Sequence, residues 1–140
     1  MRIILIRHGD GSCGLTPVGQ GQTEKTADLL KSMELDTSKT ALLTSQLRRA
    51  VETAEIIQRN LGLTETLPKS WLTCETKENT AMNLAQFAAD HSDLAAVIAV
   101  SHMPEIEDLL GSLGFHGSAR NGSVHEVDFQ TRTVNRLFVP

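Results

Sequence analysis

The sequence predicts an α/β fold, a single domain over residues 1–140 in which a mostly parallel central sheet has helices on both faces, as a three-layer sandwich. Two runs, IILI and AVIAV, are almost purely apolar, which is typical of strands covered on both sides in a parallel sheet. Strand patterns alternate with helical patterns along the chain, and this order favours helices on either face. The length suits one domain with its own core.

The strand patterns occupy five segments. They are residues 2–6, 41–44, 96–100, 123–129 and 133–139, and a further short extended piece is expected at residues 67–72. In the fourth segment apolar and polar residues alternate, so we expect that strand to lie nearer an edge of the sheet than the first and third.

Helical patterns lie between these strands. The first helix is expected to start after Thr16 and Pro17, a capping residue followed by proline. One face of this helix carries Thr23, Ala27, Leu30 and Met33. Three later helices have similar stripes. The second helix has Leu47, Ala50, Val51, Ala54, Ile57 and Leu61, the third has Ala81, Leu84, Ala85 and Ala88, and the fourth has Ile106, Leu109, Leu110 and Leu113. Gly62 and Gly114 follow the second and fourth stripes and are expected to end those helices.

Composition and charge argue against several classes of function. A formal net charge of -4 is unfavourable for a nucleic-acid surface, and four Phe, one Trp and no Tyr offer few platforms for base stacking. No apolar run approaches the length of a membrane span, and no cationic leader precedes the first strand. The two cysteines, Cys13 and Cys74, lack metal-binding spacing. We therefore expect a cytoplasmic protein that binds neither nucleic acid nor membrane.

Arginine and histidine residues follow three of the predicted strands. Arg7 and His8 come directly after IILI, Arg49 lies in the first turn of the helix after TALLT, and His102 follows AVIAV. The carboxyl ends of parallel strands form the usual ligand site of such sheets. Guanidinium groups match phosphate oxygens, and neutral imidazole is a competent nucleophile. This set suits phosphoryl transfer without a metal.

Four motifs at these positions resemble those of the histidine phosphatase superfamily, whose small members include the SixA-type phosphohistidine phosphatases. They are RHG at residues 7–9, LTPVG at 15–19, SQLRRAVETA at 45–54 and VSHMPEI at 100–106. The resemblance covers nearly the whole chain and keeps the family's order. It implies that His8 is the nucleophile that becomes phosphorylated, and that Arg7, Arg49 and His102 form the rest of the phosphate pocket.

The resemblance also implies that the enzyme needs no metal or other cofactor. The backbone N–H of Met103, at the expected start of a helix, is a further candidate donor to phosphate. Arg48 occupies a variable position of its motif and is expected to be a solvated charge. Gln46 stands where the family usually has proline. Gly9 is expected to allow a sharp turn, and the short loop that follows leaves the pocket open.

No motif identifies the acid that protonates the leaving group. Glu75 and Glu78 are candidates by rough position, with Asp10 as a weaker one. An imidazole, with a pKa of roughly 6.5, leaves more easily than an alkoxide when no strong acid assists it. We therefore expect the substrate to be phosphohistidine on a partner protein, such as a histidine phosphotransfer domain of signal transduction. A small-molecule phosphomonoesterase of the same superfamily and a non-catalytic module that binds phosphorylated ligands are the alternatives.

Other functions fit the sequence less well. A dinucleotide-binding turn would use the G-x-G-x-x-G pattern at residues 9–14, but residues 15–17 delay the helix that its third glycine should open. A metal hydrolase would use His8, Asp10 and His102, which lack a full set of ligands. A serine hydrolase would need a G-x-S-x-G motif.

The remaining histidines are expected outside the site. His91 falls at a helix end and His116 in a glycine-flanked loop, so both are expected on the surface. His125 lies on an alternating strand and is expected to be structural, unless that strand borders the site.

Overall fold

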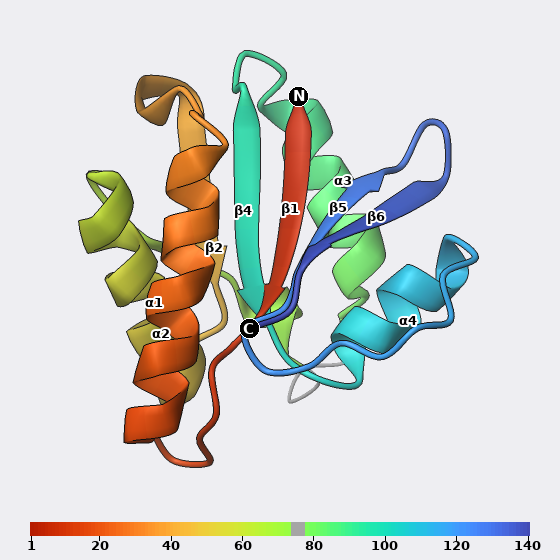
Figure 1. Cartoon of the computed structure of the whole chain (residues 1–140). Helices are drawn as coiled ribbons and strands as arrows, with labels where there is room; N and C mark the ends of the chain where they lie inside the picture. The colour runs from red at the N-terminus through yellow and green to blue at the C-terminus, as the bar shows by residue number, and fades with distance from the viewer. Residues whose placement is uncertain (74–77) are drawn as a thin grey trace.

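The computed structural model describes residues 1–73 and 78–140, which form one six-stranded sheet between two pairs of helices (Figure 1). In chain order, the strands are β1 (Arg2–Arg7), β2 (Thr40–Thr44), β3 (Leu67–Pro68), β4 (Ala96–Ser101), β5 (Val124–Asp128) and β6 (Thr133–Phe138). Across the sheet they follow the order β3-β2-β4-β1-β5-β6. The first four strands are parallel to one another, and β5 pairs antiparallel with both β1 and β6. The predicted mostly parallel sheet is therefore confirmed.

The helices cover both faces, as the sequence predicts. They are α1 (Pro17–Ser32), α2 (Arg48–Leu61), α3 (Thr80–Asp90) and α4 (Glu105–Ser112). Helices α1 and α2 pack on one face of the sheet, and α3 and α4 lie on the other (Figure 1). Alternation along β1 supplies both cores, because Ile4 and Ile6 belong to the first and Ile3 and Leu5 to the second.

Local chemistry explains where most helices begin and end. The Thr16 side chain accepts a hydrogen bond from the Gly19 N–H at 3.0 Å and caps α1, as the Thr-Pro pair predicts. Gly62 ends α2 in the left-handed region with φ 70°. Helix α4 differs from expectation, since it begins at Glu105 and leaves Met103 outside its first turn.

Register brings three strand ends to one edge of the sheet. Arg7 of β1 lies opposite Ser101 of β4, and Thr44 of β2 lies opposite Val100. The chain continues this alignment past the strands, because the His8 N–H donates to the Ser101 carbonyl at 3.2 Å. The loops that the sequence singled out therefore start side by side.

The extended piece predicted at residues 67–72 is shorter than expected. Only Leu67–Pro68 pairs with β2, and a 3-10 turn follows at Ser70–Leu72. Proline lacks the N–H that a continued ladder needs, which fits such a short edge strand. Among the described residues, no helix has the length and apolarity to cross a bilayer.

Candidate active site

The loops after β1, β2 and β4 enclose a cavity of about 310 Å³ at the carboxyl edge of the sheet. All four side chains predicted for the phosphate pocket line it, and so does Met103: Arg7, His8, Arg49, His102 and Met103. Gly11 and Ser12 of the short loop after β1 complete the wall. Residues that span most of the chain are therefore brought together at one site, as the sequence predicts.

His8 is held in the form that a nucleophile requires. Its Nδ1 lies 2.7 Å from the Gly9 carbonyl oxygen, which can only accept, so Nδ1 carries the proton. The lone pair is therefore on Nε2, which faces the Arg49 Nε at 3.3 Å. Burial lowers the pKa of His8 to about 4, and the charges of Arg49 and Arg7 contribute. At neutral pH the ring is thus uncharged.

Two guanidinium groups flank this imidazole. Arg49 donates from Nη1 to the Ser12 carbonyl at 2.8 Å, which fixes its guanidinium beside His8. Arg7 donates from Nη1 to the Ala119 carbonyl at 2.8 Å, while its buried Nε has no partner among the described residues. Burial lowers the pKa of Arg7 from its ordinary value, but a guanidinium remains protonated at neutral pH.

His102 lies beside His8, with their ring centroids 4.8 Å apart. Its Nε2 is 2.5 Å from the hydroxyl oxygen of Ser45, a fully buried side chain at the end of β2. Its buried Nδ1 has no partner within the described part of the chain. Burial lowers the pKa of His102 to about 3, with further contributions from His8, Arg49 and Arg7. Sequence reasoning assigned no separate role to Ser45, although it begins one of the quoted motifs.

Gly9 is needed for close packing against α1, a role that the expected turn did not include. Its φ is not in the left-handed region. A Cβ at this position would lie 2.5 Å from the Gly19 carbonyl oxygen, so the loop could not approach α1. The Gly9 N–H donates to the Thr53 hydroxyl at 3.1 Å. Thr53, like Ser45, lies inside a motif whose individual positions the sequence reasoning did not interpret.

A distant segment holds the nucleophile loop from its other side. The Asn121 side chain donates to the His8 carbonyl at 3.2 Å, and the Gly122 N–H donates to the Arg7 carbonyl at 2.9 Å. No sequence pattern pointed to this segment, because backbone acceptors carry no residue signature.

The structure does not place a candidate proton donor in the cavity that contains His8, as far as the described residues go. Glu75 lies outside the described residues. The Glu78 carboxylate accepts from the Ser70 hydroxyl at 3.2 Å, and the Asp10 carboxylate accepts from the Thr16 hydroxyl at 2.7 Å. Neither Asp10 nor Glu78 lines the cavity that contains His8. Across residues 1–73 and 78–140, no three His, Cys, Asp or Glu side chains gather so as to hold a metal ion.

Arg48 does not line the cavity that its neighbour Arg49 lines. Its side chain is 76% exposed, and its Nε lies 3.4 Å from a Glu52 carboxylate oxygen. This is the surface position that its variable place in the motif predicts.

His125 is a fully buried residue of the core on the α3–α4 side. It lies opposite Leu5 in the sheet, and its ring meets the edge of Phe115 at 5.4 Å between centroids. Neither ring nitrogen has a partner among the described residues. Burial lowers its pKa to about 4, with the charge of Arg136 contributing.

The three buried histidines predict a loss of stability in mild acid. His8 and His125 have a pKa of about 4 and His102 of about 3, whereas the unfolded chain has about 6.5. Below pH 6.5 the unfolded state therefore binds more protons than the folded state. The contribution of these histidines to the free energy of unfolding is fully present above that pH and is lost as the pH drops towards 4. Each group contributes at most about 1.4 kcal/mol per pH unit.

Thermal unfolding followed by circular dichroism between pH 7.5 and 4 tests this expectation. A His125→Leu variant should show a shallower fall in Tm, because one of the three groups is gone. A variant of the exposed His116, His116→Ala, should retain the slope of the original protein. An equal dependence of Tm on pH in all three proteins would contradict the conclusion that buried His125 contributes to the acid sensitivity.

Comparison with known proteins agrees with this geometry. The model of the histidine phosphatase superfamily (branch 1) matches residues 3–95. Comparison with curated protein sequences gives no match.

Solved structures share the fold at low sequence identity. The protein histidine phosphatase SixA complexed with tungstate superposes with a TM-score of 0.80 at 21% identity, over 99% of this chain and 95% of that one. The putative phosphohistidine phosphatase SixA from Agrobacterium tumefaciens gives 0.73 at 18%, over 99% and 98%. A mutant phosphoserine phosphatase from Entamoeba histolytica in complex with phosphoserine gives 0.72 at 18%, over 96% and 94%.

The family match covers more than half of the chain, and the fold of the phosphatase structures extends over nearly all of it. The chain therefore belongs to the histidine phosphatase superfamily, branch 1, and is a phosphatase.

Proposed function

We propose that the protein is a metal-independent phosphatase that uses His8 as its nucleophile and removes phosphate from phosphohistidine on a partner protein. The observation that carries this proposal is the state of His8. Its Nδ1 proton is committed to the Gly9 carbonyl at 2.7 Å, and its Nε2 lone pair faces the guanidinium of Arg49. The Nε2 lone pair accepts a hydrogen bond from the Arg49 Nε at 3.3 Å, and it becomes free to attack phosphorus when the substrate's phosphoryl oxygens take over that donor.

The proposed reaction has two displacements at phosphorus. His8 Nε2 forms a bond to phosphorus as the bond to the leaving nitrogen breaks, and the leaving ring takes a proton from solvent water and departs as neutral imidazole. Water then attacks the phosphoryl group on His8, which releases inorganic phosphate and restores the lone pair. Arg7 and Arg49 neutralise the charge on the phosphoryl oxygens in both steps.

The unpartnered donors of the pocket support phosphate as the ligand. Arg7 Nε and His102 Nδ1 are buried without a protein acceptor among the described residues. Leaving such a group unpaired costs about 1–3 kcal/mol, which phosphate oxygens would offset by accepting from it. In the tautomer in which the Ser45 hydroxyl donates to Nε2 of His102, Nδ1 is the ring nitrogen that bears the proton for phosphate. The Met103 N–H is a further proposed donor.

The open site supports a substrate attached to a protein. The phosphate cavity is walled by the short 9–15 loop, and the Ser12 side chain beside it is exposed. A phosphoryl group on a surface histidine can reach such a site without a lid closing over it. The partner would be a phosphohistidine-bearing protein in the cytoplasm, such as a histidine phosphotransfer domain. The SixA structures carry this same substrate class in their names.

Turnover of a phosphohistidine-carrying protein, compared with phosphoserine and other phosphomonoesters in the presence of EDTA, tests the proposal. We expect a higher kcat/KM for phosphohistidine and no effect of EDTA. Rapid quenching with radiolabelled substrate should trap an acid-labile phosphate on His8. If kcat/KM is much higher for phosphomonoesters than for phosphohistidine, the protein is the alternative small-molecule phosphatase. If neither class is hydrolysed although phosphate binds, it is the non-catalytic module.

A further inference from the structure

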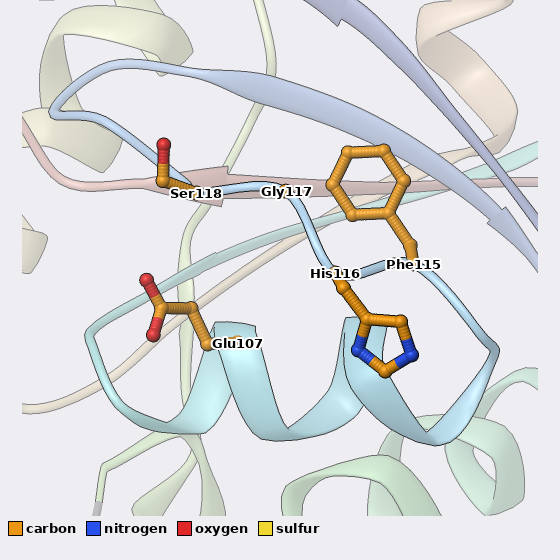
Figure 2. A pocket seen from close by; sticks show the side chains of 5 residues that line it. All are labelled: Glu107, Phe115, His116, Gly117 and Ser118. Atoms are coloured by element: carbon orange, nitrogen blue, oxygen red, sulfur yellow. The ribbon is translucent and has the colours of Figure 1, made fainter.

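A second cavity lies on the Arg7 side of the phosphate pocket. Its volume is about 290 Å³, and it lies between α4 and the loop that leads to β5. Glu107, Phe115, His116, Gly117 and Ser118 line it (Figure 2). The loop continues to Ala119, whose carbonyl accepts a hydrogen bond from Arg7 at 2.8 Å. The Arg7 side chain, which lines the phosphate pocket, is therefore bonded to the loop that walls the second cavity.

The side chains of this second cavity form an acceptor site. Figure 2 shows the Glu107 carboxylate rising from α4 towards the side where Ser118 lies, while the Phe115 ring turns away from it. Phe115 packs instead against the buried His125 at 5.4 Å between centroids. Glu107, His116 and Ser118 are exposed. The Glu107 carboxylate and the Ser118 hydroxyl lie on the same side of the cavity, whereas the His116 ring points away from them (Figure 2).

Glu107 is free to bind a ligand. Within the described residues, its carboxylate forms no hydrogen bond or ion pair, although its charge acts on nearby Arg7. A negative charge beside a phosphate pocket repels a substrate that carries only phosphate. The same charge attracts a substrate that has a cation next to its phosphoryl group, so it favours one substrate class over the other.

We propose that the Glu107–His116–Ser118 cavity is a specificity subsite that takes an ammonium or guanidinium group located beside the phosphoryl group of the substrate. The choice of phosphohistidine as the phosphorylated residue rests on the proposed function; the subsite itself rests on the position of Glu107 near Arg7. On a helical partner, a lysine or arginine three or four residues from the phosphohistidine lies on the same face and could reach it.

Two phosphohistidine peptides that differ only in a lysine or alanine at this spacing test the subsite. We expect the enzyme to prefer the lysine peptide by about fivefold in kcat/KM, mainly through KM, since a partly exposed ion pair has an effect of this order. Glu107→Gln should remove the preference. Asp108→Asn is the matched control, because it deletes the same charge from an exposed position of α4 that does not line the cavity. It should keep the preference.

Other outcomes would overturn the subsite. If the enzyme treats both peptides alike, or if Glu107→Gln lowers both rates by one factor and keeps their ratio, Glu107 acts only through Arg7. If phosphohistidine is not hydrolysed at all, the proposed function fails separately. Aminopropyl phosphate compared with propyl phosphate then decides on the subsite, because the same Glu107-dependent preference for the amine is expected.

Discussion

A His8→Ala enzyme is expected to lose essentially all turnover, by a factor on the order of 10⁴ or more, which is the scale for removal of a catalytic nucleophile. The reason is that Nε2 of His8 carries the lone pair that is proposed to attack phosphorus. Its Nδ1 proton is already committed to the Gly9 carbonyl. Steady-state rates on the preferred phosphorylated substrate, together with the absence of a trapped acid-labile phosphate, measure the effect.

Binding separates lost chemistry from lost structure. The Ala variant retains Arg7 and Arg49, so it should still bind inorganic phosphate in a calorimetric titration and should keep its far-ultraviolet circular dichroism. His91→Ala removes an exposed histidine at the C-terminal end of α3, outside both the phosphate pocket and the proposed subsite. It serves to show that a histidine change elsewhere leaves the phosphoenzyme detectable. A His8→Ala enzyme that keeps a tenth of the original rate would refute His8 as the nucleophile.

Arg49→Lys is expected to lower kcat/KM by about 10²–10³-fold, the range for loss of one preorganised donor to a transition state. Arg49 reaches Nε2 of His8 with its Nε and the Ser12 carbonyl with Nη1, at 3.3 and 2.8 Å. A lysine ammonium is a single point of charge on a flexible stem and cannot keep both contacts. The charge is preserved, so a large loss would show that the geometry of the guanidinium matters.

The neighbouring residue gives a matched control for this change. Arg48 precedes Arg49 on the same helix, but its side chain is 76% exposed and contacts Glu52 on the surface. Arg48→Lys should therefore stay within about twofold of the original enzyme, since a surface ion pair contributes little. Equal losses in the two variants would mean that the wrong arginine has been assigned to the pocket.

The strand ends could be predicted because their cause is local. Continuous apolar runs indicate strands covered on both faces, and parallel strands must end at the same edge of the sheet. This is why Arg7, His8 and His102 could be placed together from sequence. Arg49 followed from the motif around it, and its neighbour Arg48 was correctly expected on the surface.

Other features depend on approaches between backbones, which leave no pattern in a single sequence. The Ala119 carbonyl that holds Arg7 is an example, because any residue could supply it. Gly9 was expected to serve a turn, and its close approach to Gly19, a residue of another element, was not predicted. Ser45 is part of a recognised motif, but its contact with His102 could not be predicted because it depends on how β2 and β4 pair.

The bonds that fasten the nucleophile loop determine when the enzyme becomes active during its own synthesis. Asn121 is 113 residues away from His8 along the chain, and β1 has its two sheet neighbours, β4 and β5, in the later part of the sequence. Strand β1 therefore cannot pair with either neighbour until β4 or β5 has been synthesised. Such non-local pairing slows folding. A nascent chain that ends before Asn121 contains all four pocket side chains but lacks the residues that bond to the backbone of Arg7 and His8. Phosphatase activity should therefore appear only after that segment and β5 have been synthesised.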